Sequence, residues 1–141
     1  MRYILDTCTI SEVVRPQPSS AVVEWVQRQQ EEQLYLSVLT LGELRKGVAR
    51  LADGRRRLRL ENWLDCDLKL RFAGRWLQVD EDVAERCGLV TAQVAARGAV
   101  LPTIDGLIAA TALVHGMTVV TRNSADMAAS GALVLNPWEF V

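Results

Sequence analysis

Short apolar segments that favour β-strands alternate along this chain with longer segments of helical periodicity. The strand candidates are residues 3–5, 34–37, 76–79, 118–121 and 133–135. At least one helical segment separates each candidate from the next, and parallel strands need such crossover connections. The pattern therefore predicts an α/β fold, a three-layer α/β/α sandwich around a mainly parallel central sheet.

Length, charge and cysteine content narrow the class of protein further. A chain of 141 residues with 50% hydrophobic residues fits one domain, over residues 1–141. A formal net charge of −1 excludes whole-molecule attraction to polyanions, so any nucleic-acid binding must be local. Three scattered cysteines without C-x-x-C spacing indicate reduced cytosol, and the longest apolar stretch, 106–114, is too short to span a bilayer. We expect a cytoplasmic protein with no membrane segment.

Capping residues place the helices that matter most for function. A first helix is expected directly after Asp6, with Thr9 and Glu12 at the spacing of a capping box. Thr40 opens a second helical segment, with Glu43 at the corresponding third position.

Residues 40–51 and 55–72 both carry helical apolar patterns, and an Asp-Gly pair at positions 53 and 54 separates them. This arrangement predicts a helical hairpin that protrudes from the sheet.

Acidic and amide side chains follow the predicted strands or begin the predicted helices. Asp6 comes directly after the first strand, and Asn123 and Asp126 follow the strand at 118–121. Glu43 and Asp105 each lie in what we expect to be the first turn of a helix. Ligands of parallel sheets bind at the carboxyl ends of the strands, so these side chains are predicted to converge there.

Convergence of these carboxylates has an electrostatic consequence. Two negative charges about 4 Å apart repel by roughly 4 kcal/mol at an effective dielectric constant near 20. A divalent cation removes that repulsion, and carboxylate oxygens suit Mg²⁺ or Mn²⁺. The pattern therefore predicts a cation site that meets phosphate oxygens.

Each acid also has a structural interpretation. Glu43 and Asp126 each follow a possible helix-capping residue by three positions, and the helix dipole favours Asp105 in a first turn. Asp6 is the hardest to explain in this way, because a buried carboxylate needs a partner and the next basic residue is Arg15.

Four segments in this order and spacing resemble PIN-domain proteins: 4–7 (ILDT), 41–47 (LGELRKG), 105–112 (DGLIAATA) and 121–126 (TRNSAD). The segments 10–12, 15–18 and 136–138 make the chain similar to the VapC toxins of toxin–antitoxin pairs, in their FitB-like branch. The resemblance extends over essentially the whole chain.

The resemblance implies a Mg²⁺- or Mn²⁺-dependent endoribonuclease that acts as the toxin of a type II pair. Its catalytic and metal-binding acids fall on Asp6, Glu43, Asp105 and a fourth position, for which Asp126 is favoured over Asn123. The family also implies a homodimer and a small cognate antitoxin that blocks the acidic site, with a larger complex on operator DNA. The predicted hairpin offers a docking surface for the antitoxin or for a second subunit.

Several residues around the acids are assigned supporting parts. Thr7, Thr121 and Asn123 are candidates for orienting a ligand or phosphate, although Thr7 equally suits helix capping. Cys8 replaces the Asn or Ser that relatives often carry after Asp-Thr, and packing as a small hydrophobe is one interpretation of it. Whether one or two ions bind stays open.

Two alternatives belong to other classes of protein. A non-catalytic RNA-binding or antitoxin-binding module is possible on the same fold, and metal-dependent cleavage distinguishes the enzyme from it. A Mg²⁺-dependent phosphoacceptor signalling domain requires an aspartate after a middle strand and a lysine after a late one. Here the strand at 34–37 ends without Asp, and Arg122 follows the late strand, which disfavours this alternative.

Overall fold

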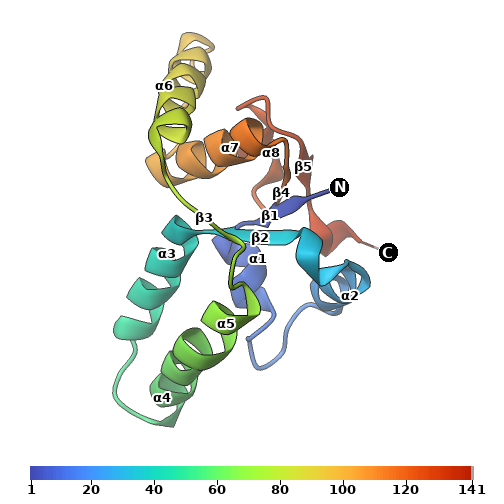
Figure 1. Ribbon diagram of the computed structural model, residues 1–141, viewed down its shortest axis with the longest axis vertical. Coiled ribbons are helices and arrows are strands. Elements are labelled where there is room, and N and C mark those ends of the chain that lie inside the picture. Colours follow the sequence, from blue (N-terminus) through green and yellow to red (C-terminus); the bar gives the residue numbers. More distant parts are fainter. Residues whose placement is uncertain (141) are drawn as a thin grey trace.

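The computed structural model describes residues 1–140, and in it strands and helices alternate as the sequence predicts (Figure 1). Within these residues one sheet is formed by β1 (Tyr3–Leu5), β2 (Leu34–Ser37), β3 (Trp76–Leu77), β4 (Thr118–Val120) and β5 (Val134–Leu135). The strand order is β3-β2-β1-β4-β5, and every neighbouring pair is parallel. β1 is the central strand, so the residue that follows it lies in the middle of the carboxyl edge.

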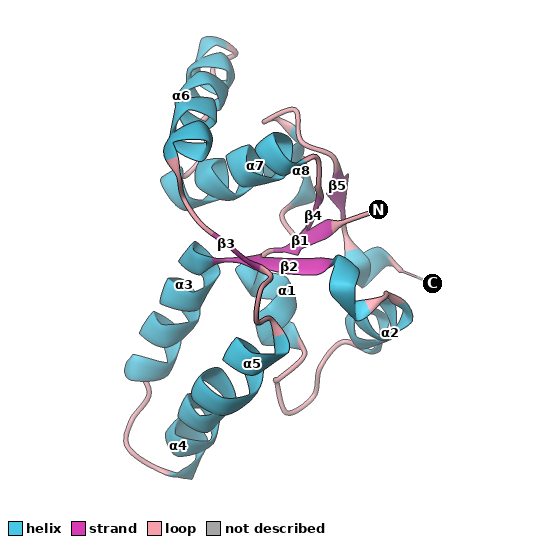
Figure 2. Cartoon of the chain, in the orientation of Figure 1, coloured by secondary structure: helices cyan, strands magenta, loops and turns pink. Residues whose placement is uncertain are grey.

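Helices cover both faces of the sheet, which confirms the predicted α/β/α sandwich (Figure 2). The helices are α1 (Thr7–Glu12), α2 (Ser20–Arg28), α3 (Val38–Ala49), α4 (Arg55–Asn62), α5 (Lys69–Arg71), α6 (Glu81–Ala96), α7 (Thr103–His115) and α8 (Ser124–Ala128). Two single 3₁₀ turns, Glu31–Gln33 and Pro137–Glu139, complete the helical elements described. Over residues 1–140, none of the helices is both long enough and apolar enough to cross a membrane.

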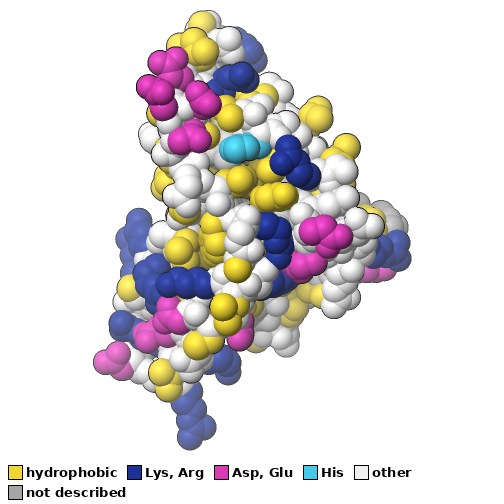
Figure 3. Space-filling model, in the orientation of Figure 1, with side chains coloured by type: hydrophobic (Ala, Val, Ile, Leu, Met, Phe, Trp, Pro, Cys, Tyr) yellow, Lys and Arg dark blue, Asp and Glu magenta, His cyan; other side chains and the backbone are white. Residues whose placement is uncertain are grey.

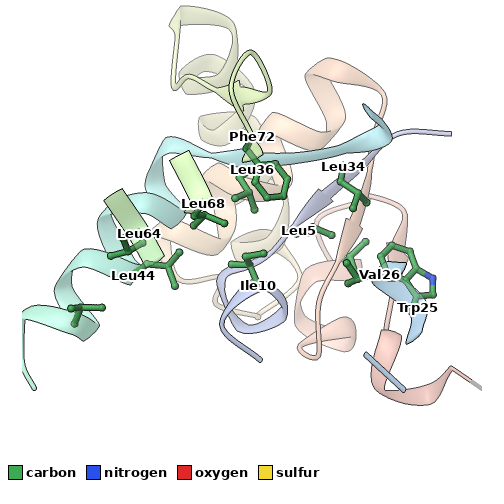
Figure 4. Close-up of a cluster of buried hydrophobic side chains, with 12 residues drawn as sticks. Leu5, Ile10, Trp25, Val26, Leu34, Leu36, Leu44, Leu64, Leu68 and Phe72 are labelled. Atoms are coloured by element: carbon green, nitrogen blue, oxygen red, sulfur yellow. The ribbon is translucent and has the colours of Figure 1, made fainter. Parts of the chain in front are cut away.

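Successive strand residues point to opposite faces of the sheet and so divide the core in two. Leu5 and Val120 pack with the helices on one side, and Ile4 and Val119 pack with α7 and α8 on the other. The first cluster is the larger and is drawn in Figure 4: Leu5, Ile10, Trp25, Val26, Leu34, Leu36, Leu44, Val48, Leu64, Leu68, Phe72 and Val120. The sheet is thus held rigidly from both sides.

The predicted helical hairpin is formed by α3 and by a second arm that runs from α4 to α5. The second arm passes through one π-helical segment, Trp63–Leu68, without a break in the helix. Leu64, Leu68 and Phe72 are at most 1% exposed and anchor this arm to the first core cluster. The far end of the hairpin extends away from the sheet (Figure 1).

The predicted capping box in the first helix is wrong. α1 begins at Thr7, and its N-cap is Asp6, whose side chain accepts a hydrogen bond from the Thr7 amide. Glu12 is the last residue of α1 and is only 6% exposed. It accepts hydrogen bonds from the Ser19 amide and from the Arg15 guanidinium, so it holds the following loop instead of capping a helix start.

The helix that carries Glu43 also begins earlier than predicted. Ser37, the last residue of β2, is the N-cap of α3 and accepts a hydrogen bond from the Leu39 amide. Thr40 therefore lies inside the helix, and Glu43 lies in its second turn. The capping interpretation of Glu43 fails for this reason, because the amide groups of the first turn are too far away.

Candidate active site

Asp6 lies at the centre of the carboxyl edge of the sheet. Its backbone amide donates to the carbonyl oxygen of Val120 at 2.9 Å, which continues the pairing of β1 with β4. Its Oδ1 accepts from the Thr7 amide at 2.8 Å, and the residue is only 7% exposed. The sequence position directly after a buried strand thus produces a nearly buried carboxylate with one oxygen bound to the start of α1.

The second oxygen of Asp6 is held by side chains from two other segments. Thr121 Oγ1 donates to Asp6 Oδ2 at 2.8 Å and accepts from the Asn123 amide at 3.1 Å. Cys8 Sγ lies 3.7 Å from the same carboxylate oxygen and donates to it. Burial, followed by the negative charge of Asp6, raises the pKa of the Cys8 thiol, so the thiol stays protonated. Cys8 is therefore a hydrogen-bond donor in this structure and not only a packing residue.

Thr7 joins Asp6 to Glu43. The Thr7 hydroxyl donates to Glu43 Oε1 at 2.6 Å, and its oxygen lies 3.1 Å from Thr40 Oγ1. Thr40 is fully buried inside α3, one turn before Glu43. From the sequence, Thr40 was expected only to cap a helix. Its position three residues before Glu43 on the same helix could have indicated that both side chains face α1.

Asp105 supplies the third carboxylate, from the first turn of α7. Partial burial raises the pKa of Asp105, and the negative charges of Asp6, Glu43 and Asp126 raise it further. The charges of Asp6, Glu43 and Asp126 therefore act on Asp105, although the four acids come from the end of β1 and from α3, α7 and α8. Their convergence into one cation site stays a prediction.

The fourth position contains two residues that behave differently. Asp126 lies exposed on α8 and contributes its charge to the cluster. Asn123 precedes α8, and its side chain makes no capping hydrogen bond, whereas its backbone amide is bound by Thr121. The structure thus places an acid and an amide side by side at this position, as the sequence does.

The donor set fits a hard divalent cation. Within residues 1–140, no ion pair involves Asp6, Glu43, Asp105 or Asp126. In the same range, no group of three or more Asp, Glu, His or Cys side chains is already placed to hold a metal ion. Mg²⁺ keeps several waters and usually takes one or two protein carboxylates directly, so it would need only one or two of these acids as direct ligands.

Residues 3–129 match the family model of the PIN domain. The chain belongs to the PIN domain family. It is 40% identical over 136 residues to VapC ribonuclease Y4jK of Sinorhizobium fredii, covering 96% of this chain and 97% of that protein. It is 41% identical over 135 residues to toxin FitB of Neisseria gonorrhoeae, with 96% and 97% covered. The resemblance inferred from four short segments is thereby confirmed.

Solved structures agree with the family assignment. A FitAB complex bound to an IR36 DNA fragment contains a chain that superposes with a TM-score of 0.95 at 39% identity. That match covers 99% of this chain and 97% of the other. The helical hairpin and the parallel sheet described above are therefore the architecture of a PIN domain.

A groove leads from the acidic edge of this PIN domain along the hairpin. It encloses about 340 Å³, and Thr7 and Glu43 belong to its lining. Its apolar wall comes from the loop after α1, from α3 and the residues after it, and from the second arm of the hairpin: Val14, Leu44, Val48, Leu51, Leu60 and Trp63. Arg15, Arg56 and Arg59 line it as well, and Lys and Arg side chains gather over the α3–α4 arm in Figure 3. The groove thus combines apolar walls with positive charge.

Residues 55–59 contain four arginines, the densest basic run of the chain, and the groove gives these arginines different surroundings. Arg57 pairs with Glu61 at 2.8 Å and with Asp53 at 3.3 Å, as expected of a solvated helix face. Arg56 and Arg59 instead line the groove that reaches Glu43. Helical periodicity separates them from Arg57, but the sequence contains no signal for the groove itself, which needs α1 and α3 in place.

Proposed function

We propose that this chain, as a single PIN-like domain over residues 1–141, is the toxin of a type II toxin–antitoxin pair and a metal-dependent endoribonuclease. The observation that carries the proposal is the electrostatic effect of three other acids on Asp105, since none of the four has a basic partner within residues 1–140. The relatives named VapC ribonuclease and toxin FitB support it at about 40% identity over nearly the full chain.

Asp6 and Asp105 would hold the Mg²⁺ or Mn²⁺ ion, with Glu43 and Asp126 binding it directly or through water. When bound, the ion activates water and neutralises charge on the scissile phosphate. Thr121 and Cys8 orient Oδ2 of Asp6, and the Thr7 amide orients Oδ1.

Two further hydrogen bonds position the remaining groups. The Thr7 hydroxyl holds Glu43 towards the cluster. Asn123, tethered through its amide to Thr121, supports the fourth position beside Asp126. These bonds orient the acids through the protein's own groups, and such preorganisation lowers the barrier to cleavage.

Metal dependence of cleavage is the direct test. Purified protein should cut RNA in Mg²⁺ or Mn²⁺, stop in EDTA, and resume when either ion is restored. Binding of RNA without cleavage under all metal conditions would support the non-catalytic module instead. The RNA substrate is best found by mapping new 5′ and 3′ ends in cells after induction.

We further propose a small cognate antitoxin as partner, a homodimeric toxin, and a larger complex of both on operator DNA. One solved structure similar to this chain is a FitAB complex bound to a DNA fragment. The groove beside Glu43 has apolar walls and arginines, which suit an amphipathic segment with acidic residues. We expect the antitoxin to dock there and to cover the acidic edge.

Coexpression with the neighbouring small reading frame tests the partner. The two proteins should copurify, and growth arrest should be relieved. Arg59 lines the groove beside Glu43 and is exposed, so Arg59→Glu should weaken copurification with an acidic antitoxin segment. Arg50→Glu is the matched control, since Arg50 is also exposed and does not line the groove. Equal loss from both variants would contradict docking on this surface.

A further inference from the structure

Arg122 occupies a position beside the acidic edge for which the proposed mechanism has no use. It directly follows Thr121, the residue that binds Asp6. Its backbone lies beside the Cys8 thiol, which contacts the same carboxylate. Its side chain is exposed. A positive charge is therefore attached just after β4, next to the residue that binds Asp6.

The guanidinium of Arg122 is held in place by an aromatic ring. Its central carbon lies 5.1 Å from the centroid of the Trp138 ring. Trp138 is half-buried, and its amide donates to Asn136 Oδ1 at 3.0 Å, which anchors the short helical turn that carries the ring. The contact restricts a side chain that would otherwise be flexible.

No acid neutralises Arg122 within the part of the chain that the structure describes. The basic residues in ion pairs there are Arg15, Arg28, Arg45, Arg57, Lys69, Arg71 and Arg75. The N–H groups of a guanidinium lie in its plane, so a contact through its face leaves them free for a second ligand. Arg122 thus presents hydrogen-bond donors and an unneutralised charge to solvent.

We propose that Arg122, positioned by Trp138, binds a phosphate of the RNA strand next to the phosphate that is cut. The inference rests on the proposed ribonuclease function. Four carboxylates repel an RNA backbone, and one divalent ion neutralises only half of their charge. An arginine without an acidic partner offsets part of the remaining negative charge near this edge. Its planar N–H donors match two phosphate oxygens. A protein carboxylate has similar chemistry, but the adjacency to Thr121 and Asp6 favours the substrate.

Salt dependence of RNA binding tests the inference. In the Asp6→Asn background, which stops cleavage, the Kd for a labelled mixed-sequence single-stranded RNA is measured from about 50 to 200 mM KCl. Arg122→Gln should weaken binding about 5- to 10-fold at low salt and reduce the slope of log Kd against log salt by about 0.7, the contribution of one single-strand phosphate. Arg122→Lys keeps the charge and should keep the slope.

Arg28 provides a control with the same charge and a similar aromatic contact, although its guanidinium also pairs with Glu24 at 2.6 Å. It is exposed and lies 5.2 Å over the Phe140 ring, but it ends α2, which leads to the amino end of β2 on the opposite edge. Arg28→Gln should leave the slope unchanged. Trp138→Leu should weaken binding about twofold, and Trp138→Phe should restore it, with the slope kept in both.

An unchanged slope in Arg122→Gln would overturn the inference, as would an equal change in Arg28→Gln. Weaker antitoxin copurification with unchanged RNA binding would overturn it in favour of a protein contact. Failure of the proposed function is a separate result, because it appears as absence of metal-dependent cleavage in the chain with no substitution. Thermal unfolding of each variant checks that the fold is kept.

Discussion

The acidic edge of the sheet and the helical hairpin beside it differ in whether their acidic side chains have basic partners. On the hairpin, Asp65 pairs with both Arg45 and Lys69, and Glu61 pairs with Arg57. At the edge, Asp6 and Glu43 accept from hydroxyl, thiol and amide donors. Within residues 1–140, none of the four carboxylates there has a basic partner. Acids are therefore neutralised by basic side chains on the hairpin and left to repel one another at the edge.

The difference shows which region serves stability and which serves binding. The hairpin buries Leu64, Leu68 and Phe72 in the core, and its surface charges are compensated. The edge keeps an electrostatic repulsion that a folded protein has no structural reason to retain. Such locally unfavourable arrangements are typical of functional sites. Substitutions in the two regions should consequently separate function from stability.

The largest effect is expected at Asp6. Asp6→Asn should lower the rate of RNA cleavage about 100- to 1,000-fold, because removing one preorganised electrostatic contact has that effect in other active sites. The rate is measured with Mg²⁺ present, and circular dichroism checks the fold. Asp53→Asn is the control, since the Asp53 side chain is 98% exposed on the hairpin turn. Cleavage by Asp6→Asn at the rate of the unmodified chain would refute the site assignment.

Leu68→Ala, in contrast to Asp6→Asn, should act on the stability of the fold. Leu68 is 1% exposed, so its truncation should lower the free energy of unfolding by about 3 kcal/mol through lost burial and a new cavity. Leu70→Ala, two residues away and 72% exposed, should change it by less than about 0.5 kcal/mol. Urea unfolding measures both. Similar losses from the two variants would show that the second arm is not anchored in the core as described.

Thr7→Val should reduce kcat about tenfold while leaving stability nearly unchanged, since one hydrogen bond to a charged group is lost. The Thr7 amide still binds Asp6, so only the orientation of Glu43 is affected. Thr7→Ser retains the hydroxyl and should restore most of the rate. Steady-state kinetics with RNA separates kcat from KM, and an effect on KM alone would assign Thr7 to substrate binding.

The smallest effect concerns the pH dependence of stability. The pKa of Asp105 is raised in the folded chain, so its stabilising contribution is full below the ordinary value of 3.8 and is lost as pH rises through the raised value. In EDTA at neutral pH, Asp105→Asn should therefore be more stable than the unmodified chain, by up to about 1 kcal/mol after solvent screening. The difference should shrink as pH falls towards 4.

Thermal unfolding from pH 4 to 8 measures this difference, and adding Mg²⁺ sharpens it. Metal binding should stabilise the chain that retains Asp105 more than Asp105→Asn, so the difference between the two Tm values should narrow or reverse. Asp53→Asn should show neither the pH-dependent stabilisation nor the change in Tm difference on adding Mg²⁺. A stabilisation of Asp105→Asn that is independent of pH would mean that repulsion among the carboxylates is not its cause.

Much of the fold is encoded in local patterns. Short apolar strands between amphipathic helices predicted the layers, and the Asp-Gly break at 53 and 54 predicted the hairpin. Helix starts were less predictable. Thr40 and Thr9 have capping-box spacing, but Ser37 and Asp6 are the residues that cap, because the ends of β2 and β1 deliver them to the helix starts. The competition between possible caps is decided by where each strand ends.

The candidate site likewise contains some features that the sequence predicts and others that it does not. Asp6 was predictable alone, because a carboxylate directly after a buried strand requires a partner. The Thr7–Glu43 hydrogen bond spans 36 residues and the Thr121–Asp6 bond spans 115, and no local pattern encodes either of them. The contact of Arg122 with Trp138 likewise depends on the chain returning to the edge after β5.

The order of residues by itself determined the parallel α/β architecture, the family, and the types of side chain available for a cation, since these depend on periodicity and short motifs. Only the tertiary structure decided which oxygens face one another, which arginines remain without acids, and where the groove opens. These properties depend on distances between distant segments, and packing on both faces of the sheet sets those distances.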